Sequence, residues 1–527
     1  MRASVVVLAA LAVTTAFFST LLFGGSLAGA DWASHHFHYF DFARQSLTEH
    51  HVLPLYMANA WITPNFLANA EAPQLGPLVP LLFVLSTGVY LKLLIAVFGA
   101  AGLVGMFALL RDLRVAAEVA VLGSVVFACN GFFTSHLAVG HPWAMGAWLL
   151  PALVCLFRRA VRGSTRALVA AAALNAFTIF GGQHQPFIWQ HFAIALIAVG
   201  WAVQERSWRP VLVWAAFAAL CAGLGAVKLF PMLVEFADYD PSARTPGIPL
   251  SALVFTLLGR GQDAGTSVSQ LAFQHGSGWW EWAFYTGPVA LLFLLVGSIA
   301  ARRAWPLVAL GVFFLVLSVD ATGLVHGLDP WAALEGLPVW RTQRSPSRFL
   351  VLAIFAFSVT GALGTQRLLE AARSRWPAAA PRAVMVLAVL ALLDAGLESR
   401  AWQAQAVGEP LAAVDSRPRP LRVRAPGIEA ELASFAPNTL IYRVHARGAG
   451  TLELPLRQRG DEWTIDGWPA YSRGGRLAVD VTQGRHELVL TYRPRFAFAG
   501  AATSTCAWIA VAFLGLAGWG GRGPLAA

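Results

Sequence analysis

Charged residues are scarce in this chain: they make up 13% of its 527 residues, while 57% are hydrophobic. A soluble protein of this length would need far more polar surface, so the composition excludes an ordinary soluble enzyme. Lysine occurs only as Lys92 and Lys228, and the net charge of +10 therefore comes from arginine. A basic chain can indicate nucleic-acid binding, but here the positive-inside rule of membrane proteins accounts for the arginines, and we expect no nucleic-acid partner.

Cysteine and the motifs of soluble enzymes are scarce as well. Cys129, Cys155, Cys221 and Cys506 lie in apolar runs without CxxC or metal-ligand spacing, so we expect small membrane-core residues rather than disulfides. The chain has no GxxxxGK[ST] phosphate loop, no HExxH and no GxSxG motif, which argues against a nucleotide or zinc-protease site of the soluble type. We therefore assign no cofactor and no metal ligands, and leave a divalent metal open.

Long apolar runs take up most of the remaining sequence. A helix needs about 20 apolar residues to cross a bilayer, and about 12 runs approach that length. The expected spans cover residues 5–27, 90–110, 116–132, 143–157, 167–180, 187–203, 211–230, 284–299, 306–319, 349–368, 383–397 and 498–516. The sequence therefore predicts a mainly α-helical, polytopic transmembrane bundle. Its multi-span membrane domain covers residues 1–399, and residues 496–527 form a final span with a short cytoplasmic tail.

Arginine alternates between the loops that join these runs. If Arg2 lies in the cytoplasm, the loops on that side carry Arg111, Arg114, Arg158, Arg159, Arg162, Arg166, Arg206, Arg209, Arg302, Arg303, Arg367, Arg373, Arg375, Arg382 and Arg522. The intervening loops, above all 30–75 and 231–283, are longer and carry other polar residues and Trp. This alternation predicts a multi-pass protein of the bacterial cytoplasmic (inner) membrane, with a cytoplasmic N-terminus and an active site on the outer face. The alternative is a signal peptide cleaved near residues 28–30, but the apolar run exceeds the usual length of roughly 7–15 residues.

Residues 400–495 differ in composition from the rest of the chain. Arg, Pro, Glu and Asp become frequent, and a Pro-rich stretch at 417–420 predicts an extended spacer. Short alternating stretches follow at 440–446, 451–456, 462–465, 476–481 and 487–492, with glycines between them. This pattern predicts a small extracytoplasmic antiparallel β-sandwich. Two roles stay open for it: a packing module, or a domain that binds carbohydrate or acceptor.

The first outer loop holds the most informative group of polar residues. Asp31, His35 and His38 would share one face of a helix. A carboxylate beside imidazoles at the edge of the bilayer suits general-base work or metal binding. Asp41 could form an i, i+3 ion pair with an arginine, which is more often structural. The alternative for the whole loop is a polar interfacial helix. Further polar residues of this loop are His36, Asn69 and Glu71.

Other expected outer loops add polar groups on the same side of the membrane. His141, His184 and Glu235 each follow the outer end of an expected span. Arg344 and Arg348 precede the span at 349–368, at an expected helix N-terminus, where the dipole and free N–H groups favour anions. Two guanidiniums there suit a phosphate clamp. The alternative for this pair is anchoring to lipid headgroups.

In layout the chain resembles the GT-C-type glycosyltransferases, integral membrane enzymes that take sugars from polyprenyl-phosphate carriers. Within them it is most similar to the bacterial YfhO-like membrane proteins. The likeness rests on three stretches: residues 31–80 with Asn69-Ala-Glu71-Ala-Pro73, residues 339–350 with the Gly361/Gly364 helix after them, and residues 463–467 with 484–494 before the final span.

The resemblance implies an inverting transfer of a sugar from a polyprenyl-phosphate donor to a glycan, lipid or protein acceptor at the bilayer. In GT-C enzymes an acidic residue of the first outer loop is the catalytic centre; that role maps to Asp31, with Asp41 second. This chain lacks an adjacent acidic pair, which weakens the case for an essential metal. Arg344, Arg348 and His184 would stabilise the leaving lipid phosphate. The other substrate-binding candidates are His35, His36, Asn69, Glu71, His141 and Glu235.

Two other functions stay open. One is a transporter or flippase for lipid-linked glycans, and the other is a non-catalytic cell-envelope assembly protein that uses the β-rich domain to hold a partner. Transporters usually show inverted repeats and broken spans near the midplane. The sequence has no convincing repeat, and its ionisable residues cluster at the ends of the expected spans, so we favour transfer.

Overall fold

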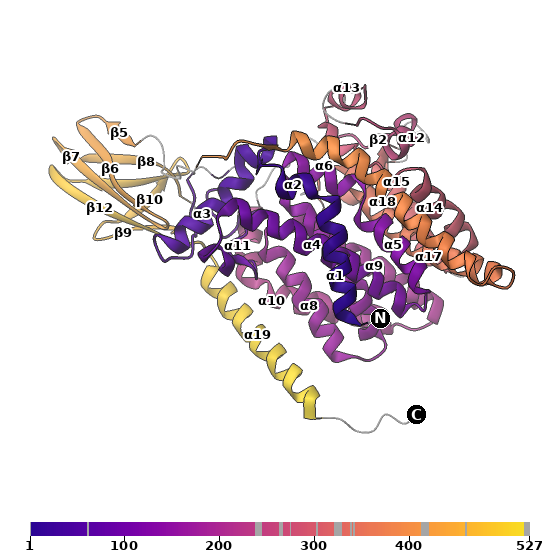
Figure 1. The fold of residues 1–527 in the computed structure, drawn as a ribbon. Helices are drawn as coiled ribbons and strands as arrows, with labels where there is room; N and C mark the ends of the chain where they lie inside the picture. Colours follow the sequence, from indigo (N-terminus) through magenta and orange to yellow (C-terminus); the bar gives the residue numbers. More distant parts are fainter. Residues whose placement is uncertain are drawn as a thin grey trace.

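The computed structural model describes residues 2–520 except 59, 61–62, 238–244, 263–266, 275, 302–303, 321–328, 338–339, 341–342, 413–420 and 459–460, and the side chains of 267–269 and 515–520. Most of this chain is helical, and the C-terminal strands gather in a separate region at one end of the helical bundle (Figure 1). Arg302, Arg303, Arg522 and the expected spacer at 417–420 lie outside the described residues.

The helices follow the apolar runs of the sequence. They are α1 (Ala3–Phe17), α2 (Ser19–Phe23), α3 (Phe37–Thr48), α4 (Thr87–Asp112), α5 (Ala117–Ala128), α6 (Gly131–Val139), α7 (Leu150–Val161), α8 (Thr165–Phe180), α9 (His184–Glu205), α10 (Arg209–Leu224), α11 (Ala226–Glu235), α12 (Leu250–Leu258), α13 (Ser267–Gln274), α14 (Pro288–Ala300), α15 (Trp305–Ser318), α16 (Ala332–Glu335), α17 (Leu350–Arg373), α18 (Ala379–Gln405) and α19 (Ala497–Gly520). Short irregular turns join them, among them a π-turn at Trp32–His36 and 3₁₀ turns at Val79–Phe83, Pro142–Leu149, Trp279–Glu281 and Pro346–Phe349.

Among the described residues, seven helices are long and apolar enough to cross a membrane. They cover Thr87–Asp112, Ala117–Val139, Pro142–Val161, His184–Glu205, Pro346–Arg373, Ala379–Gln405 and Ala497–Leu514. An eighth candidate is the pair α10 and α11, which is bent by 84°. The chain therefore has the helices that a polytopic membrane protein needs. The shorter apolar helices α1, α8, α14 and α15 cover only 10–17 residues each, so the predicted number of about 12 spans stays a prediction.

Small residues bring several of these helices into close contact. A Cβ atom added to Gly364 of α17 would lie 1.7 Å from the carbonyl oxygen of Gly297 of α14, and one on Gly297 would lie 2.2 Å from that of Gly361. Glycine at all three positions lets the two backbones touch, as in small-residue contacts between membrane helices. In the same way, a Cβ atom on Gly102 of α4 would lie 2.6 Å from the ring of Trp148. Helix packing thus explains glycines that would otherwise weaken apolar helices.

The C-terminal strands form two antiparallel sheets. The strands are β5 (Arg422–Ala425), β6 (Ile428–Ala436), β7 (Thr439–Ala446), β8 (Gly450–Arg457), β9 (Trp463–Ile465), β10 (Ala470–Arg473), β11 (Arg476–Val481) and β12 (Gly484–Tyr492). The five-stranded sheet has the order β5-β6-β7-β12-β9, and the three-stranded sheet has the order β10-β11-β8. Alternate side chains of both sheets, such as Tyr442 and Leu454, belong to one buried apolar cluster. The predicted C-terminal β region is therefore confirmed.

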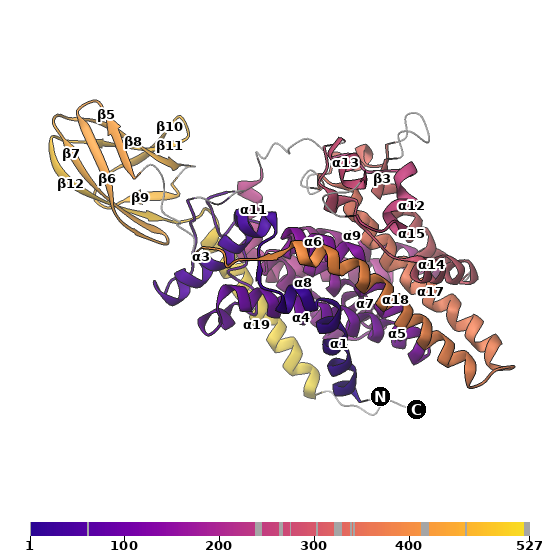
Figure 2. The ribbon, with the colours of Figure 1, turned by 45° about the horizontal axis from the view of Figure 1, so that its top comes forward.

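The first loop is tied to this β region. Asn438, at the turn between β6 and β7, has a positive φ of 72°, and its side-chain oxygen accepts a hydrogen bond from the backbone N–H of Leu55 at 2.6 Å. Tyr56 packs its ring against Trp463 and Tyr492, with centroids 4.8 and 5.1 Å apart. Figure 2 shows the strands beside α3 and α11, with α19 running back along the bundle. The chain therefore docks its β region onto the loop that carries Asp31.

Two short strand pairs lie outside the C-terminal β region. β1 (Ser26–Leu27) pairs with β4 (Val407–Gly408), directly after α18. β2 (Ile248–Pro249) pairs with β3 (Val319–Asp320). The side chain of Gln403 also accepts a hydrogen bond from the backbone N–H of Leu21 at 3.3 Å. The chain after the first helix is therefore fixed by segments nearly 400 residues away.

Candidate active site

Asp31 lies where the first loop passes closely over the end of α6. A Cβ atom on Gly29 would lie 2.0 Å from a carbonyl oxygen of α6, and one on Gly140 would lie 2.2 Å from the backbone nitrogen of Trp32. Gly140 also has a φ of 117°, which residues with a side chain rarely adopt. Glycine at both positions lets the loop lie against α6, and this contact places Asp31 beside His141.

Asp31, His141 and His136 form a chain of hydrogen bonds. Oδ2 of Asp31 lies 2.7 Å from Nε2 of His141, and Nδ1 of His141 lies 2.8 Å from Nδ1 of His136. With Asp31 ionised, Nε2 of His141 carries the proton and donates it, so Nδ1 of His141 accepts from His136. Nε2 of His136 is then a buried acceptor, and it has no partner among the described residues. Two buried imidazoles thus orient one carboxylate.

The electrostatics of the chain keep this carboxylate ionised. Burial raises the pKa of Asp31, but the hydrogen bond and the charge of His141, with smaller effects of His35 and Arg348, outweigh it and leave the pKa below its usual value. Burial lowers the pKa of His141, although Asp31 opposes this shift. Burial likewise lowers the pKa of His35. At neutral pH the pair is therefore a carboxylate beside a neutral imidazole that donates a hydrogen bond to it.

Asp31 is also partly open to solvent. Its side chain is 26% exposed, against 8% for His141. In the part of the chain that the structure describes, Oδ1 of Asp31 accepts no hydrogen bond, while Oδ2 is held by His141. One oxygen is thus fixed and the other is free to meet a hydroxyl group, which is the geometry that a general base needs.

A buried ion pair lies beside the hydrogen-bonded residues Asp31, His141 and His136. Nε of Arg348 donates to both carboxylate oxygens of Glu281, at 3.1 and 2.8 Å, and Nη2 also contacts Oε1. Nη1 of Arg348 donates to Oε1 of Gln185 at 2.7 Å, and the guanidinium lies 4.6 Å from the ring centre of Trp143. Burial alone would raise the pKa of Glu281, but the charge and hydrogen bonds of Arg348 lower it. Arg348 is therefore held in one orientation, with its charge partly balanced.

Glu71 is the third acidic group of the site, after Asp31 and Glu281. The Asn69 side chain accepts a hydrogen bond from the backbone N–H of Glu71 at 3.0 Å, and a Cβ atom on Gly182 would lie 2.3 Å from the carbonyl oxygen of Glu71. Oε2 of Glu71 lies 3.9 Å from Nε2 of His36. Burial raises the pKa of Glu71 to about 7, although Arg348 and Lys228 act against the shift. Glu71 therefore changes protonation near neutral pH, unlike Asp31.

His35, His36 and Glu71 form a group that could hold a metal ion. Their nearest donor atoms all lie within 4.8 Å of one another, and two imidazoles with one carboxylate are a donor set that zinc accepts. The separation of 3.9 Å between His36 and Glu71 is wider than the roughly 3.4 Å between two ligands of a tetrahedral zinc. The side chains would therefore have to move closer together to hold an ion.

Two of the predicted site residues, Asp41 and Glu235, bind elsewhere in the fold and not to Asp31. Asp41 accepts hydrogen bonds from Thr87 and Gln45, both at 2.8 Å, so it joins α3 to the first turn of α4. Glu235 accepts hydrogen bonds from Thr63 at 2.8 Å and from Arg457 at 2.9 Å, so it joins the first loop to the β region. Both residues therefore have structural contacts, and neither is hydrogen-bonded to Asp31, His141 or His136, which together are called the Asp31 group.

His184 and Arg344 lie closer to the site. His184 is within electrostatic reach of Lys228 and Arg348, and its Nδ1 has no hydrogen-bond partner among the described residues. The side chain of Arg344 is exposed, its charge acts on both Glu71 and Glu281, and its carbonyl oxygen is held by the backbone N–H of Thr245 at 2.9 Å. Both residues therefore lie near the charged groups around Arg348 and Glu71 and can contribute to an anion site there.

Two charged residues of the site were missed from the sequence. Glu281 lies among tryptophans, and nothing in its spacing predicts the contact with Arg348, which is 67 residues away. Lys228 is buried and donates a hydrogen bond to the carbonyl oxygen of Ala72. A signal for Lys228 was present, because an ionisable residue inside an apolar run is a functional candidate by default.

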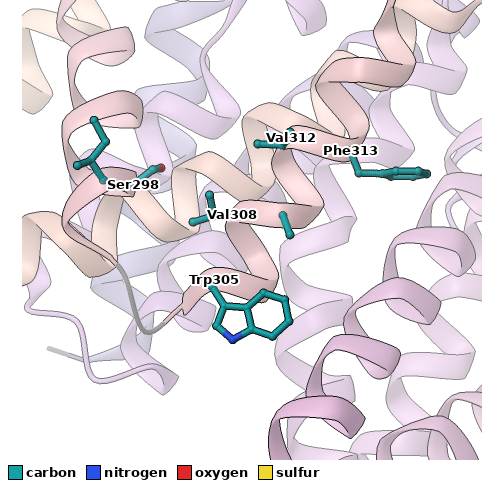
Figure 3. Close-up of a pocket in the computed structure, with 7 residues that line it drawn as sticks. Ser298, Trp305, Val308, Val312 and Phe313 are labelled. Atoms are coloured by element: carbon teal, nitrogen blue, oxygen red, sulfur yellow. The ribbon is translucent and has the colours of Figure 1, made fainter. Parts of the chain in front are cut away.

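A cavity elsewhere in the bundle carries none of these residues. It has a volume of about 660 Å³ and is lined by residues of α14 and α15 (Figure 3). Its lining is Ser298, Ile299, Trp305, Val308, Ala309, Val312 and Phe313. Such an apolar hollow has no group for acid–base chemistry.

No protein-family model matches this chain, and no curated protein matches it either. The function is therefore inferred from the geometry around Asp31.

Proposed function

We propose that this protein is a membrane glycosyltransferase of the GT-C type, which moves a sugar from a polyprenyl-phosphate donor to an acceptor. In this proposal the bundle crosses a bacterial inner membrane about 12 times, the site faces outward, and the C-terminal strands form an extracytoplasmic β-sandwich. The observation that carries the proposal is the Asp31 carboxylate, with one oxygen held by a buried histidine pair and the other free.

Asp31 acts as the general base in this mechanism. Its free Oδ1 takes the proton from an acceptor hydroxyl as the hydroxyl oxygen bonds to the anomeric carbon. The bond from that carbon to the phosphate oxygen breaks, and the electron pair stays on the leaving lipid phosphate. Attack opposite the leaving group inverts the anomeric centre. His141 is a positioning residue, since it fixes Oδ2 at 2.7 Å and donates a hydrogen bond to the carboxylate before the transfer.

Positive groups around Asp31 supply the stabilisation of the leaving phosphate. Arg344 offers an exposed guanidinium, and Arg348 adds a second charge whose orientation is fixed by Glu281. Oriented cations at the position of developing charge are usually the largest single contribution to such catalysis. His35, His36 and Glu71 bring their donor atoms within 4.8 Å of one another; a divalent ion held there would add Lewis-acid stabilisation.

A specific observation favours a second candidate, a transporter of lipid-linked glycans. α10 and α11 meet at Gly225 with a bend of 84°, and the buried Lys228 follows directly after the bend. Broken spans with a polar residue at the break are typical of transporters. A transporter would lose function in Lys228→Met and retain it in Asp31→Asn, whereas the transferase would lose catalysis in Asp31→Asn.

The test is mass spectrometry of surface glycans in a deletion strain. Complementation with the wild type restores the missing sugar, and Asp31→Asn does not, although it reaches the membrane in equal amount. Glu49→Gln is the matched control, because Glu49 is exposed at the end of α3 in the same loop, and it restores the sugar fully. Unchanged glycans in the deletion strain would contradict the proposal, and so would full restoration by Asp31→Asn.

A further inference from the structure

A second cavity lies among helices that do not carry the Asp31 group. It has a volume of about 510 Å³, within the range of roughly 300–1,000 Å³ that is usual for ligand sites. Its walls come from the C-terminal ends of α4, α7 and α9, the start of α15 and the middle of α17. The apolar lining residues include Leu109, Val154, Leu307, Phe355, Val359 and Leu363. This part of the cavity is suited to hydrocarbon.

The rim of this cavity is polar and carries excess positive charge. Arg158 and Arg162 line it together with Gln204 and Glu205. Arg158 is paired with Asp112, and Arg159 and Arg162 lie 3.2 and 3.5 Å from the same carboxylate. Three guanidiniums thus share one carboxylate, and even with Glu205 the rim keeps a net positive charge. The side chain of Arg162, which lines the cavity, is 56% exposed, so its donors can reach a ligand.

An aromatic residue also lines the cavity, together with the apolar walls and the arginines. Trp201 lines the cavity and stacks on Phe157, with ring centres 6.0 Å apart and an interplanar angle of 13°. Tryptophan is enriched at the level of lipid headgroups, where its ring sits between hydrocarbon and water. Arginines with long apolar stems have the same preference. The apolar walls, the tryptophan and the excess of arginine therefore suit an amphiphile with an anionic head.

We propose that this cavity binds one anionic phospholipid. An acyl chain fills the apolar part, and the phosphodiester lies at the rim against Arg162 and the outer side of Arg158. Basic pockets between membrane helices bind anionic headgroups in this way. The apolar walls favour a lipid over free phosphate, and the excess of guanidinium groups favours an anionic lipid over a zwitterionic one. The inference does not rest on the proposed transferase activity.

The test uses the full chain, delipidated in a neutral detergent, and native mass spectrometry. Phosphatidylglycerol and phosphatidylcholine with identical acyl chains are titrated separately, and inorganic phosphate is added as a competitor. We expect phosphatidylglycerol to bind at least tenfold more tightly than phosphatidylcholine. Inorganic phosphate at equal concentration should not displace it. Equal affinity for the two lipids, or displacement by phosphate, would overturn the assignment.

Two variants locate the binding site. Arg162→Gln should weaken phosphatidylglycerol binding about fivefold, the effect of about 1 kcal/mol per basic residue, and leave phosphatidylcholine unchanged. Arg375→Gln is the matched control, because Arg375 is exposed and does not line the cavity. Leu307→Trp should fill the cavity and weaken the binding of both lipids. Leu363→Phe replaces it if the first variant does not fold. Equal effects of Arg162→Gln and Arg375→Gln would show general surface attraction and refute the site.

Discussion

The ion pair between Glu281 and Arg348 gives a prediction whose size follows from its contacts. The two side chains are only 5% and 8% exposed, so solvent screens their interaction weakly. Glu281→Gln keeps the shape of the side chain but removes its charge and turns one acceptor into an N–H donor that faces the guanidinium. The remaining oxygen can still accept from Arg348, but at least one hydrogen bond between charged groups is lost, a contribution of about 1.5–3 kcal/mol, and the buried guanidinium loses its counter-charge. The variant should therefore lose about 3–5 kcal/mol of unfolding free energy, as expected for a buried charge without its partner.

The assay is denaturant unfolding of the purified protein in detergent micelles, followed by tryptophan fluorescence. The double variant Glu281→Gln/Arg348→Met should be more stable than Glu281→Gln alone, because it also removes the uncompensated charge. Glu431→Gln is the matched control, since its contact with Arg422 is 3.0 Å long but largely exposed, and it should cost less than about 1 kcal/mol. A cost below about 1 kcal/mol for Glu281→Gln, or a double variant as unstable as the sum of the single ones, would refute the reasoning.

Three further predictions follow from single contacts. Gly140→Ala forces a Cβ atom within 2.2 Å of the first loop at a φ of 117° and should reduce transfer at least tenfold, whereas Gly276→Ala, with φ of 70° but open space, should not. Glu235→Gln weakens the hydrogen bond to Arg457, and limited proteolysis should then cleave the β region faster. Arg348 lowers the pKa of Glu281, so the ion pair stabilises the fold fully above the unfolded pKa of about 4.3, and this stabilisation is lost as pH falls through the lower folded pKa. The difference in unfolding free energy between wild type and Glu281→Gln should therefore shrink below about pH 4.

Much of the helical framework could be predicted because the apolar runs are long. α4 and α9 each begin and end within a few residues of an expected span, since a bilayer leaves a helix few alternatives to satisfy its backbone. α17 and α18 contain most of their expected spans but end five and eight residues later. The run at 116–132 ends differently, because Asn130 accepts a hydrogen bond from the N–H of Phe132 and starts a new helix. Such a cap inside an apolar run interrupts the helix without changing its mean hydropathy.

The site could be predicted only in part. Asp31 and His141 were both identified, but their hydrogen bond joins residues 110 positions apart, and periodicity describes only near neighbours. The ambiguity between Asp31 and Asp41 is reduced by their surroundings: Asp41 is 5% exposed and is held by Thr87, whereas Asp31 keeps a free oxygen. Contacts across the fold, rather than residue types, therefore distinguish a structural carboxylate from a candidate base.

The most direct test of the central claim is sugar transfer by the purified protein. Radiolabelled polyprenyl-phosphate hexose or pentose is the donor, and membranes of the deletion strain supply the acceptor. Wild-type protein should move label from the donor lipid to membrane glycan, and Asp31→Asn should lower the rate by about 10²–10⁴, the usual contribution of a general base. Transfer by Asp31→Asn at the wild-type rate would contradict the account, and so would the absence of transfer by the wild type with every donor.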